Sequence, residues 1–223
     1  LFQAGAGRNW CVLNLGGGVI GDMGGFCAGT YKRGIDFIQV PTTLLSQVDA
    51  SVGGKLGIDF FGVKNSIGLF RDPRAVWADP RFFQTLSARE LRSGFAEIIK
   101  HALIADERQW NDLQTITQLE TVDWADWVAR SVAIKQQIVA QDPLEKGLRK
   151  ALNFGHTIGH AVESYFLETD KPLLHGEAIA IGMICESWLS AEILGLSEAE
   201  LSAITAFFLK WYGHRALPLD KTE

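Results

Sequence analysis

The 223-residue chain is 47% hydrophobic and 21% charged, which is enough apolar sequence for one or two globular cores. Its formal net charge of −5 and its lack of a long basic run argue against nucleic acid or an anionic membrane as a partner. No apolar run approaches the ~18 residues of a membrane span. The scattered cysteines Cys11, Cys27 and Cys185 predict buried free thiols in a reducing cytoplasm.

A short apolar run at residues 11–15 predicts the first strand, and the glycines at 16–18 follow it directly. The small residues that come next predict a helix. Glycines let the backbone approach a phosphate, and the first N–H groups of a helix bind one, so this arrangement is typical of a nucleotide pyrophosphate site. The cluster is not a clean G-x-G-x-x-G, and a tight turn with close helix packing explains it equally well.

A second strand is predicted at 36–40 and a third at 75–79. Between them, Thr42 or Thr43 is a natural N-cap for a helix around 44–48. Strands that alternate with helices indicate a parallel α/β sheet. The sequence therefore predicts the α/β class for the N-terminal part of the chain.

Two glycine-rich stretches, 49–59 and 62–68, predict loops that carry polar side chains. A lysine in such a loop is either solvated or, because glycine frees the backbone beside it, placed to grip a phosphate. The polar side chains of these loops are Asp49, Lys55, Lys64 and Asn65.

From about residue 80 onward, helical patterns replace the strands. We expect an α/β nucleotide-binding part at 1–80 and an all-helical part at 81–223, with a polar cleft between them. The helices are predicted at 88–103, 122–140, 148–166, 175–194 and 197–211.

Three charged residues of these helices lie in apolar surroundings. Lys135 either snorkels to the surface or joins Arg149 as a second cation for an anionic substrate group. Glu97, flanked by apolar residues, needs a partner if it is buried. Lys100 follows Glu97 by three residues and is expected to face the same cavity.

Four polar residues between 149 and 160 are spaced by four, three and four, which places them on one face of a helix. They are Arg149, Asn153, His156 and His160. Two histidines at i and i+4 are a weak metal signal, and the Glu of an H-E-x-x-H motif is missing. A third ligand would strengthen it, because two His and one Glu form a catalytic zinc set with one open position. The candidates for that ligand are Glu97 and His175.

Several motifs together resemble the 3-dehydroquinate synthase family of sugar-phosphate cyclases, whose fold is similar to that of glycerol dehydrogenases. They occur in the family's order from about residue 11 to 190. The motifs are G-G-G-V-I-G-D, Y-K-R-G, P-T-T-L-L-S-Q-V-D-A-S-V-G-G-K, G-V-K-N-S-I-G, F-A-E-I-I-K, L-N-F-G-H-T-I-G-H-A-V-E and L-H-G-E-A-I-A-I-G-M. The resemblance implies an N-terminal, partly present Rossmann-like NAD-binding domain followed by an all-α metal and substrate domain.

The same resemblance implies roles for individual residues. Glu97, His156 and His175 match ligands of zinc or cobalt, which makes His160 a substrate-contacting residue and not a ligand. Arg33 matches an arginine that reaches the phosphate from a neighbouring subunit, which implies a homodimer. Cofactor contacts match Gly17, Gly18, Val19, Ile20, Gly21, Asp22, Thr42, Thr43, Lys55, Lys64 and Thr85. Substrate contacts match Asp49, Lys55, Asn65, Lys100, Lys135, Arg149, Asn153 and His160, of which Lys55, Lys100, Asn153 and His160 are expected to be catalytic.

The implied reaction converts 3-deoxy-arabino-heptulosonate 7-phosphate into 3-dehydroquinate and phosphate in the shikimate pathway. The substrate is oxidised, loses phosphate by elimination, is reduced again and closes by an aldol step. Because NAD is restored in each turnover, the enzyme is expected to be a phosphorus–oxygen lyase and not a net oxidoreductase.

The chain also departs from the family pattern at both ends. The family's first strands and the acidic residue expected on the cofactor ribose have no counterpart before Leu1, and a late phosphate-binding lysine has none after His214; Lys221 fits that position poorly. We therefore expect a piece of a longer protein that binds NAD weakly or not at all by itself.

Three alternatives stay open. A polyol dehydrogenase of the same fold needs no clamp for a carboxylate or phosphate, so Lys135 and Arg149 count against it. A cyclase that makes a carboxylate-free ring would be expected to lose those cations. The third alternative is a non-catalytic fragment.

Overall fold

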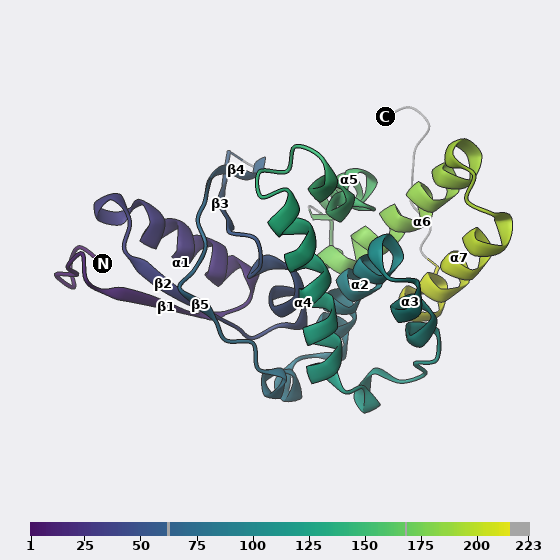
Figure 1. The fold of residues 1–223 in the computed structure, drawn as a ribbon, viewed down its shortest axis with the longest axis horizontal. Helices are drawn as coiled ribbons and strands as arrows, with labels where there is room; N and C mark the ends of the chain where they lie inside the picture. Colours follow the sequence, from purple (N-terminus) through teal and green to yellow (C-terminus); the bar gives the residue numbers. More distant parts are fainter. Residues whose placement is uncertain (62, 168, 215–223) are drawn as a thin grey trace. The chain divides into compact units, whose positions relative to one another are not determined.

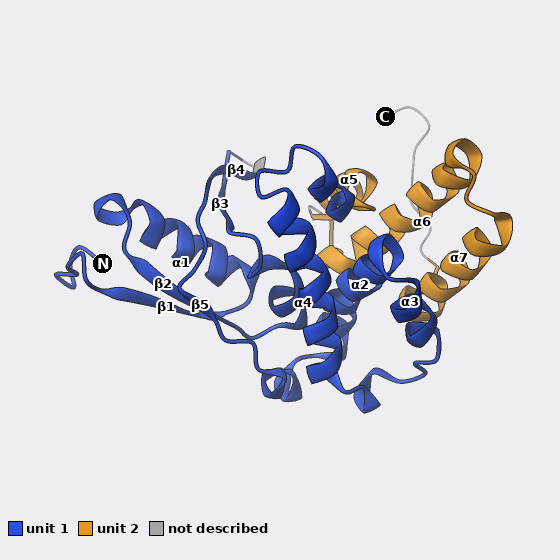
Figure 2. Cartoon of the chain, viewed as in Figure 1, with its two compact units in different colours: residues 1–153 blue, residues 154–223 orange. Residues whose placement is uncertain are grey.

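The computed structural model describes residues 1–61, 63–167 and 169–214 (Figure 1). The chain forms two compact units, residues 1–153 and 154–223 (Figure 2). The boundary predicted from the sequence, between residues 80 and 81, separates a nucleotide-binding part from a metal- and substrate-binding part, and it stays a prediction.

Unit 1 contains a parallel sheet with the strand order β1-β2-β5. The strands are β1 (Cys11–Gly16), β2 (Asp36–Pro41) and the very short β5 (Ala75–Val76). Helix α1 (Gly18–Thr30) connects β1 to β2, and its buried Ala28 packs in one cluster with residues of β2. The predicted parallel α/β arrangement is confirmed for this unit, although the third strand is shorter than the expected range 75–79.

The predicted glycine-rich loops are wrong for residues 55–59 and 63–68, which form an antiparallel hairpin of β3 (Lys55–Phe60) and β4 (Val63–Phe70), whereas residues 51–54 lie in a turn as expected. Leu56 of β3 is buried in the same cluster as Ala28 of α1. A Cβ atom on Gly68 would lie 2.4 Å from the carbonyl oxygen of Leu56. The glycine permits the two strands to approach closely. Because glycine is also common in loops, the composition alone predicted a loop.

The helix expected around 44–48 is present, and Thr43 is its cap as predicted. The Thr43 hydroxyl accepts a hydrogen bond from the Ser46 amide at 3.1 Å. The turn then widens into the π-helical segment η2 (Ser46–Ala50), which carries Asp49. Such single π turns are frequent at functional sites.

Three helices complete unit 1: α2 (Ala88–Ala105), α3 (Glu107–Gln114) and α4 (Trp124–Gln141). Helices α2 and α4 agree with the predicted ranges, whereas α3 was not predicted. Asp106 lies between the two helices: it follows α2 and is the N-cap of α3, where its carboxylate accepts a hydrogen bond from the backbone amide of Gln109 at 3.0 Å. The short 3-10 segments are η1 (Tyr31–Arg33), η3 (Pro80–Thr85), η4 (Leu119–Thr121) and η5 (Leu148–Asn153).

The predicted single helix at 148–166 is wrong. The chain forms the 3-10 turn η5 in unit 1 and then α5 (His156–Leu167) in unit 2, with Gly155 between them at a φ of 78°. A Cβ on Gly155 would lie 2.4 Å from Cγ of Met183 in the neighbouring helix. The left-handed backbone at this glycine ends the helical run. The stripe from Arg149 to His160 is therefore not one helix face.

The rest of unit 2 consists of α6 (His175–Leu194) and α7 (Glu198–Tyr212), both close to their predicted ranges. Helices α5 and α6 pack closely: a Cβ on Gly182 of α6 would lie only 2.7 Å from the backbone nitrogen of Gly159 in α5. Within the described residues, every helix is too short or too polar to span a membrane.

All three cysteines are free, but the expectation that they are buried is wrong. Cys11 and Cys27 are exposed, and Cys185 is half-buried. Cys11 lies on β1, an edge strand of the sheet whose apolar residues Leu13 and Leu15 are also exposed.

Candidate metal and anion-binding site

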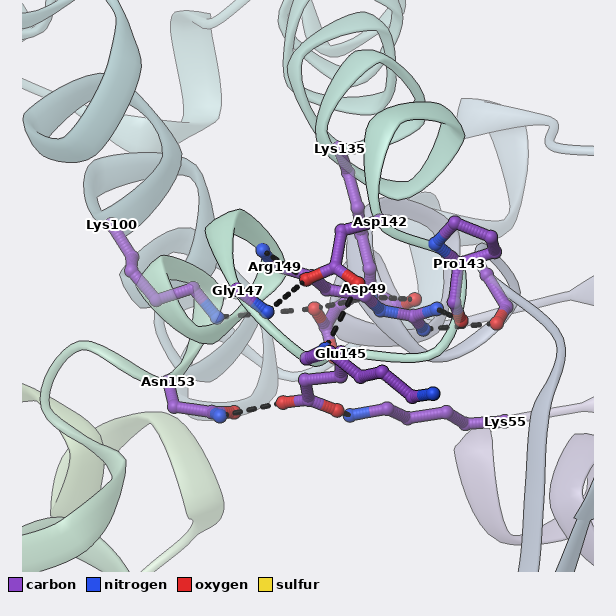
Figure 3. Close-up of polar contacts among 12 residues, drawn as sticks. Asp49, Lys55, Lys100, Lys135, Asp142, Pro143, Glu145, Gly147, Arg149 and Asn153 are labelled. Atoms are coloured by element: carbon purple, nitrogen blue, oxygen red, sulfur yellow. Dashed lines mark hydrogen bonds and ion pairs between the residues drawn. The ribbon is translucent and has the colours of Figure 1, made fainter.

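A buried group of charges surrounds Asp49 in unit 1 (Figure 3). The Lys135 ammonium donates to the Asp49 carboxylate and to the Asp49 carbonyl oxygen, each at 2.6 Å. The Lys100 nitrogen lies 3.9 Å from the same carboxylate. Burial acts to raise the pKa of Asp49, but the two lysines hold that pKa well below its usual range. Lys135 therefore points inward to a carboxylate and does not snorkel.

Glu97 is completely buried, and its carboxylate forms an ion pair with Lys100, as the spacing of three residues predicts. The neighbouring His101 is buried too, and its Nδ1 lies 2.7 Å from the Ser131 hydroxyl oxygen. Burial lowers the pKa of His101 to about 3, so the imidazole is neutral at pH 7. The negative charges of the Asp49 and Glu97 carboxylates are thus balanced by the positive charges of the Lys100 and Lys135 ammonium groups.

A second polar group joins Lys55, Glu145 and Asn153. Glu145 forms an ion pair with Lys55 and accepts a hydrogen bond from the Asn153 amide at 2.6 Å. Figure 3 shows its carboxylate between these two side chains. Burial acts to raise the pKa of Glu145, and the bonds from Lys55 and Asn153 lower it below its ordinary value. Sequence reasoning missed Glu145, because the stretch D-P-L-E-K-G has only the composition of a polar turn.

Arg149 is 2% exposed, and its two terminal nitrogens donate to carbonyl oxygens, to Pro143 at 2.7 Å and Gly53 at 2.9 Å. A Cβ on Gly53 would lie 2.6 Å from the guanidinium, so only glycine leaves room for it there. The guanidinium carbon also lies 5.8 Å from the centre of the Phe70 ring. Both hydrogen bonds go to neutral acceptors, which keeps the cation's full charge available to an anion.

The turn from β1 into α1 has the geometry expected of a phosphate site. Gly17 is the N-cap of α1, and the first amides of a helix have no partner within it. Beyond this turn, Asp22, Lys55 and Asn65 line one cavity of about 450 Å³. Burial and the nearby Asp49 raise the pKa of Asp22 to about 6.

The remaining predicted contacts of unit 1 are spread more widely. Thr42 donates its amide to the Gly16 carbonyl oxygen at 2.9 Å, which joins the ends of β2 and β1. Arg33 and Thr85 are exposed in η1 and η3, away from the groups above. The Lys64 side chain and Lys221 lie outside the described part of the structure.

Unit 2 brings three histidines together. One ring nitrogen each of His156, His160 and His175 lies within 4.8 Å of the others. Nδ1 of His156 lies 3.1 Å from the Phe154 carbonyl oxygen, and Nδ1 of His175 lies 3.4 Å from the Glu163 carboxylate. A histidine that donates from Nδ1 keeps the Nε2 lone pair for a metal.

The donor chemistry of these histidines fits zinc or cobalt, since imidazole binds both metals and the Phe154 carbonyl and the Glu163 carboxylate can accept from the other ring nitrogens of His156 and His175. Sequence reasoning missed Glu163, although it lies seven residues after His156, two helical turns further along α5. Glu97 belongs to unit 1 and the histidines to unit 2. The predicted set of Glu97, His156 and His175 therefore stays a prediction.

Solved structures show the class of protein. The chain is similar to the 2-epi-5-epi-valiolone synthase of Streptomyces hygroscopicus, solved with NAD+ and Zn2+, at 32% identity and a TM-score of 0.87 over 97% of this chain and 61% of that one. It is similar to a 2-deoxy-scyllo-inosose synthase solved with carbaglucose-6-phosphate, NAD+ and Co2+, at 29% identity and a TM-score of 0.84 over 95% and 59%. A probable glycerol dehydrogenase from Sinorhizobium meliloti shares the fold alone, at 18% identity and a TM-score of 0.56 over 91% and 61%. The chain thus has the fold of these sugar-phosphate cyclases.

Sequence comparison is more specific. Residues 1–93 match the model of the N-terminal part of 3-dehydroquinate synthase, and residues 94–221 match that of the C-terminal part. The 3-dehydroquinate synthase of Parabacteroides distasonis is 45% identical over 100% of this chain and 63% of its own length; that of Sulfurovum is 48% identical over 94% and 59%. This chain belongs to the 3-dehydroquinate synthase family. It spans about three-fifths of the length of these relatives.

Proposed function

We propose that this chain carries a part of a 3-dehydroquinate synthase, a phosphorus–oxygen lyase of the shikimate pathway that acts in the cytoplasm. The substrate would be 3-deoxy-arabino-heptulosonate 7-phosphate, and the products 3-dehydroquinate and phosphate. The observation that carries the proposal is the group of buried cations in unit 1, of which Lys100, Lys135 and Arg149 are each less than a tenth exposed. Lys100 and Lys135 are paired with Glu97 and Asp49, whereas the buried Arg149 guanidinium donates to neutral carbonyl oxygens, and an anionic group of the substrate would balance its charge.

The proposed cofactors are NAD and a divalent metal, zinc or cobalt. Two structural relatives were solved with NAD+ and one of these metals, which supports the proposal. We propose His156, His175 and Glu97 as the ligands, and the turn from Gly17 to Asp22 with Thr42 and Thr43 as the NAD site. When bound, the two groups supply a hydride acceptor and a Lewis acid for the oxygen at the carbon to be oxidised.

The chain's own residues bind and orient the substrate in this proposal. Arg149 and Lys135 would hold its anionic groups: the Arg149 guanidinium donates to neutral carbonyl oxygens, whereas the Lys135 ammonium is paired with the Asp49 carboxylate and would share its charge with it. Lys55 and Asn153 donate hydrogen bonds to Glu145, which fixes both donors and keeps the Glu145 carboxylate ionised. His160 contacts the substrate and is not a ligand. These positions bring reacting groups together before any bond changes.

We propose a homodimer in which Arg33 reaches the phosphate of the neighbouring subunit. Its support is local: Lys32 and Arg33 both have positive φ angles, of 50° and 68°, so the chain holds an exposed arginine in an unusual turn. Non-glycine residues keep such angles when their surroundings fix them, and they cluster at functional positions.

The test uses the protein expressed at the full length of its open reading frame, with NAD and zinc added. Phosphate release from the heptulosonate 7-phosphate is the expected result, with no net formation of NADH. Release from a hexose 6-phosphate alone would favour a cyclase that makes a carboxylate-free ring. Oxidation of glycerol with accumulation of NADH would favour a dehydrogenase and overturn the proposal.

A further inference from the structure

The loop between α4 and η5 is organised by one side chain, Asp142. Its carboxylate accepts hydrogen bonds from three backbone amides, those of Lys146 at 2.9 Å, Gly147 at 2.6 Å and Arg149 at 3.1 Å (Figure 3). The bonds from Lys146 and Gly147 are the largest influences that lower the pKa of this carboxyl. The loop therefore closes around a charged acceptor at neutral pH.

This loop carries two groups of the proposed site. Glu145 lies inside it with a φ of 58°, and its side chain meets Lys55 and Asn153. Arg149 ends it, and the guanidinium donates back to the Pro143 carbonyl oxygen at the start of the loop. A non-glycine residue keeps a left-handed backbone only where its surroundings hold it there. These bonds join Asp142, which precedes Glu145, to three amides that follow it, so they close the chain around Glu145 and supply that constraint.

We infer that Asp142 is a positioning residue: it holds the loop at 143–149 so that Glu145 and Arg149 reach the substrate. Among the described residues, the side-chain contacts of Glu145 with Lys55 and Asn153 do not involve Asp142. Its two carboxylate oxygens both accept, one from Lys146 and the other from Gly147 and Arg149, so an Asn side chain would keep one acceptor and turn an NH2 group toward the remaining donor or donors. The inference rests on the proposed function, since it assigns Asp142 a part in that same site.

The chain offers a matched control in Asp106. It follows α2 as Asp142 follows α4, and its carboxylate also accepts from the backbone, at the Gln109 amide. Asp106 is the single residue between α2 and α3, and this junction carries none of the proposed site residues. Asp142→Asn and Asp106→Asn therefore make the same chemical change at two helix ends, and only the first change lies in the loop of Glu145.

The experiment compares these variants in the full-length protein by hydrogen exchange and by steady-state phosphate release. In Asp142→Asn, the peptide covering 143–149 should exchange at least tenfold faster than in the wild type, and kcat/KM should fall at least tenfold with metal content unchanged. Asp106→Asn should keep wild-type kinetics. Adding Asp142→Asn to Glu145→Gln should lower kcat/KM by less than it does in the wild type, because both changes then act through one group.

The outcomes separate this inference from the proposed function. Faster exchange of the loop with unchanged kcat and KM would overturn the positioning role. Unchanged exchange would overturn it as well. An equal loss of kcat/KM in Asp106→Asn, or full additivity with Glu145→Gln, would reduce Asp142 to a stability role. If the wild type released no phosphate, the proposed function would fail, and the exchange data would still decide whether Asp142 orders the loop.

Discussion

The two units differ in how deeply their candidate site residues are buried and in how their charges are paired. In unit 1, Asp49, Glu97, Lys100 and Lys135 are charged groups that are mostly buried and paired with one another. In unit 2, the histidines His156, His160 and His175 are half-buried or exposed, and one ring nitrogen of each lies within 4.8 Å of the others. Removing one member of the first group leaves its partner as an unpaired buried charge. The histidines are more accessible to solvent, and a change at His175 would remove its contact with the Glu163 carboxylate. Changes in unit 1 should therefore affect stability, and changes in unit 2 should affect metal binding with little effect on stability.

The largest effect is expected in unit 2. His175→Ala should remove the metal and lower phosphate release roughly a thousandfold, which corresponds to about 4 kcal/mol of barrier. Metal content is measured by mass spectrometry, and unfolding of the metal-free protein by urea. A variant that keeps its metal would show that His175 is not a ligand. A metal-free form much less stable than the metal-free wild type would break the comparison between the units.

The next effect is a loss of stability in unit 1. Lys135→Met should lower the free energy of unfolding by about 3 kcal/mol, because Asp49 loses its nearest cation while remaining partly buried. Urea unfolding measures the change. The double variant Asp49→Asn/Lys135→Met is the control and should lose less than the single one. An equal or greater loss in the double variant would mean that packing, and not the stranded charge, carries the effect.

A smaller effect is expected on substrate binding. Arg149→Ala should raise KM for the keto-acid substrate roughly ten- to a hundredfold, because a charge-assisted clamp is lost, while metal content stays intact. Steady-state kinetics and metal analysis on the same preparation measure both quantities. Loss of metal in this variant would show that the arginine serves the metal site and not the substrate.

The smallest effect concerns pH. The pKa of Asp22 is raised to about 6 in the folded protein, so the folded state binds more protons than the unfolded state between about pH 4 and 6. Its contribution to stability is therefore present at low pH and is lost as the pH rises through about 6. The loss should be about 1 kcal/mol and absent in Asp22→Asn. Urea unfolding across this range measures it, and an unchanged slope in the variant would contradict the assignment.

Sequence reasoning found the elements whose signal is local. The strands at β1 and β2, the Thr43 cap and helices α2, α4, α6 and α7 follow from periodicity and capping residues. It failed where glycine had more than one use. The glycines of the β3–β4 hairpin allow strands to meet, whereas Gly155 ends a helix that the spacing of the polar stripe predicted to continue.

The candidate site, like the fold, was predictable only in part. Lys135 was a candidate because it interrupts an apolar stripe, with a surface position as the alternative, and Lys100 was a candidate because it follows Glu97 by three residues; both are buried. Glu145 and Asp142 were not recognised, because their importance comes from a loop conformation that no spacing rule describes. A positive φ at Glu145 and three amides converging on Asp142 are properties of the folded chain alone.

The most direct test of the account is the position of the metal in crystals of the full-length protein soaked with cobalt or zinc. Anomalous scattering at the metal's absorption edge should give one peak, with Glu97, His156 and His175 as its protein ligands and His160 turned toward the substrate. A peak held by all three histidines without Glu97 would contradict the proposed metal set.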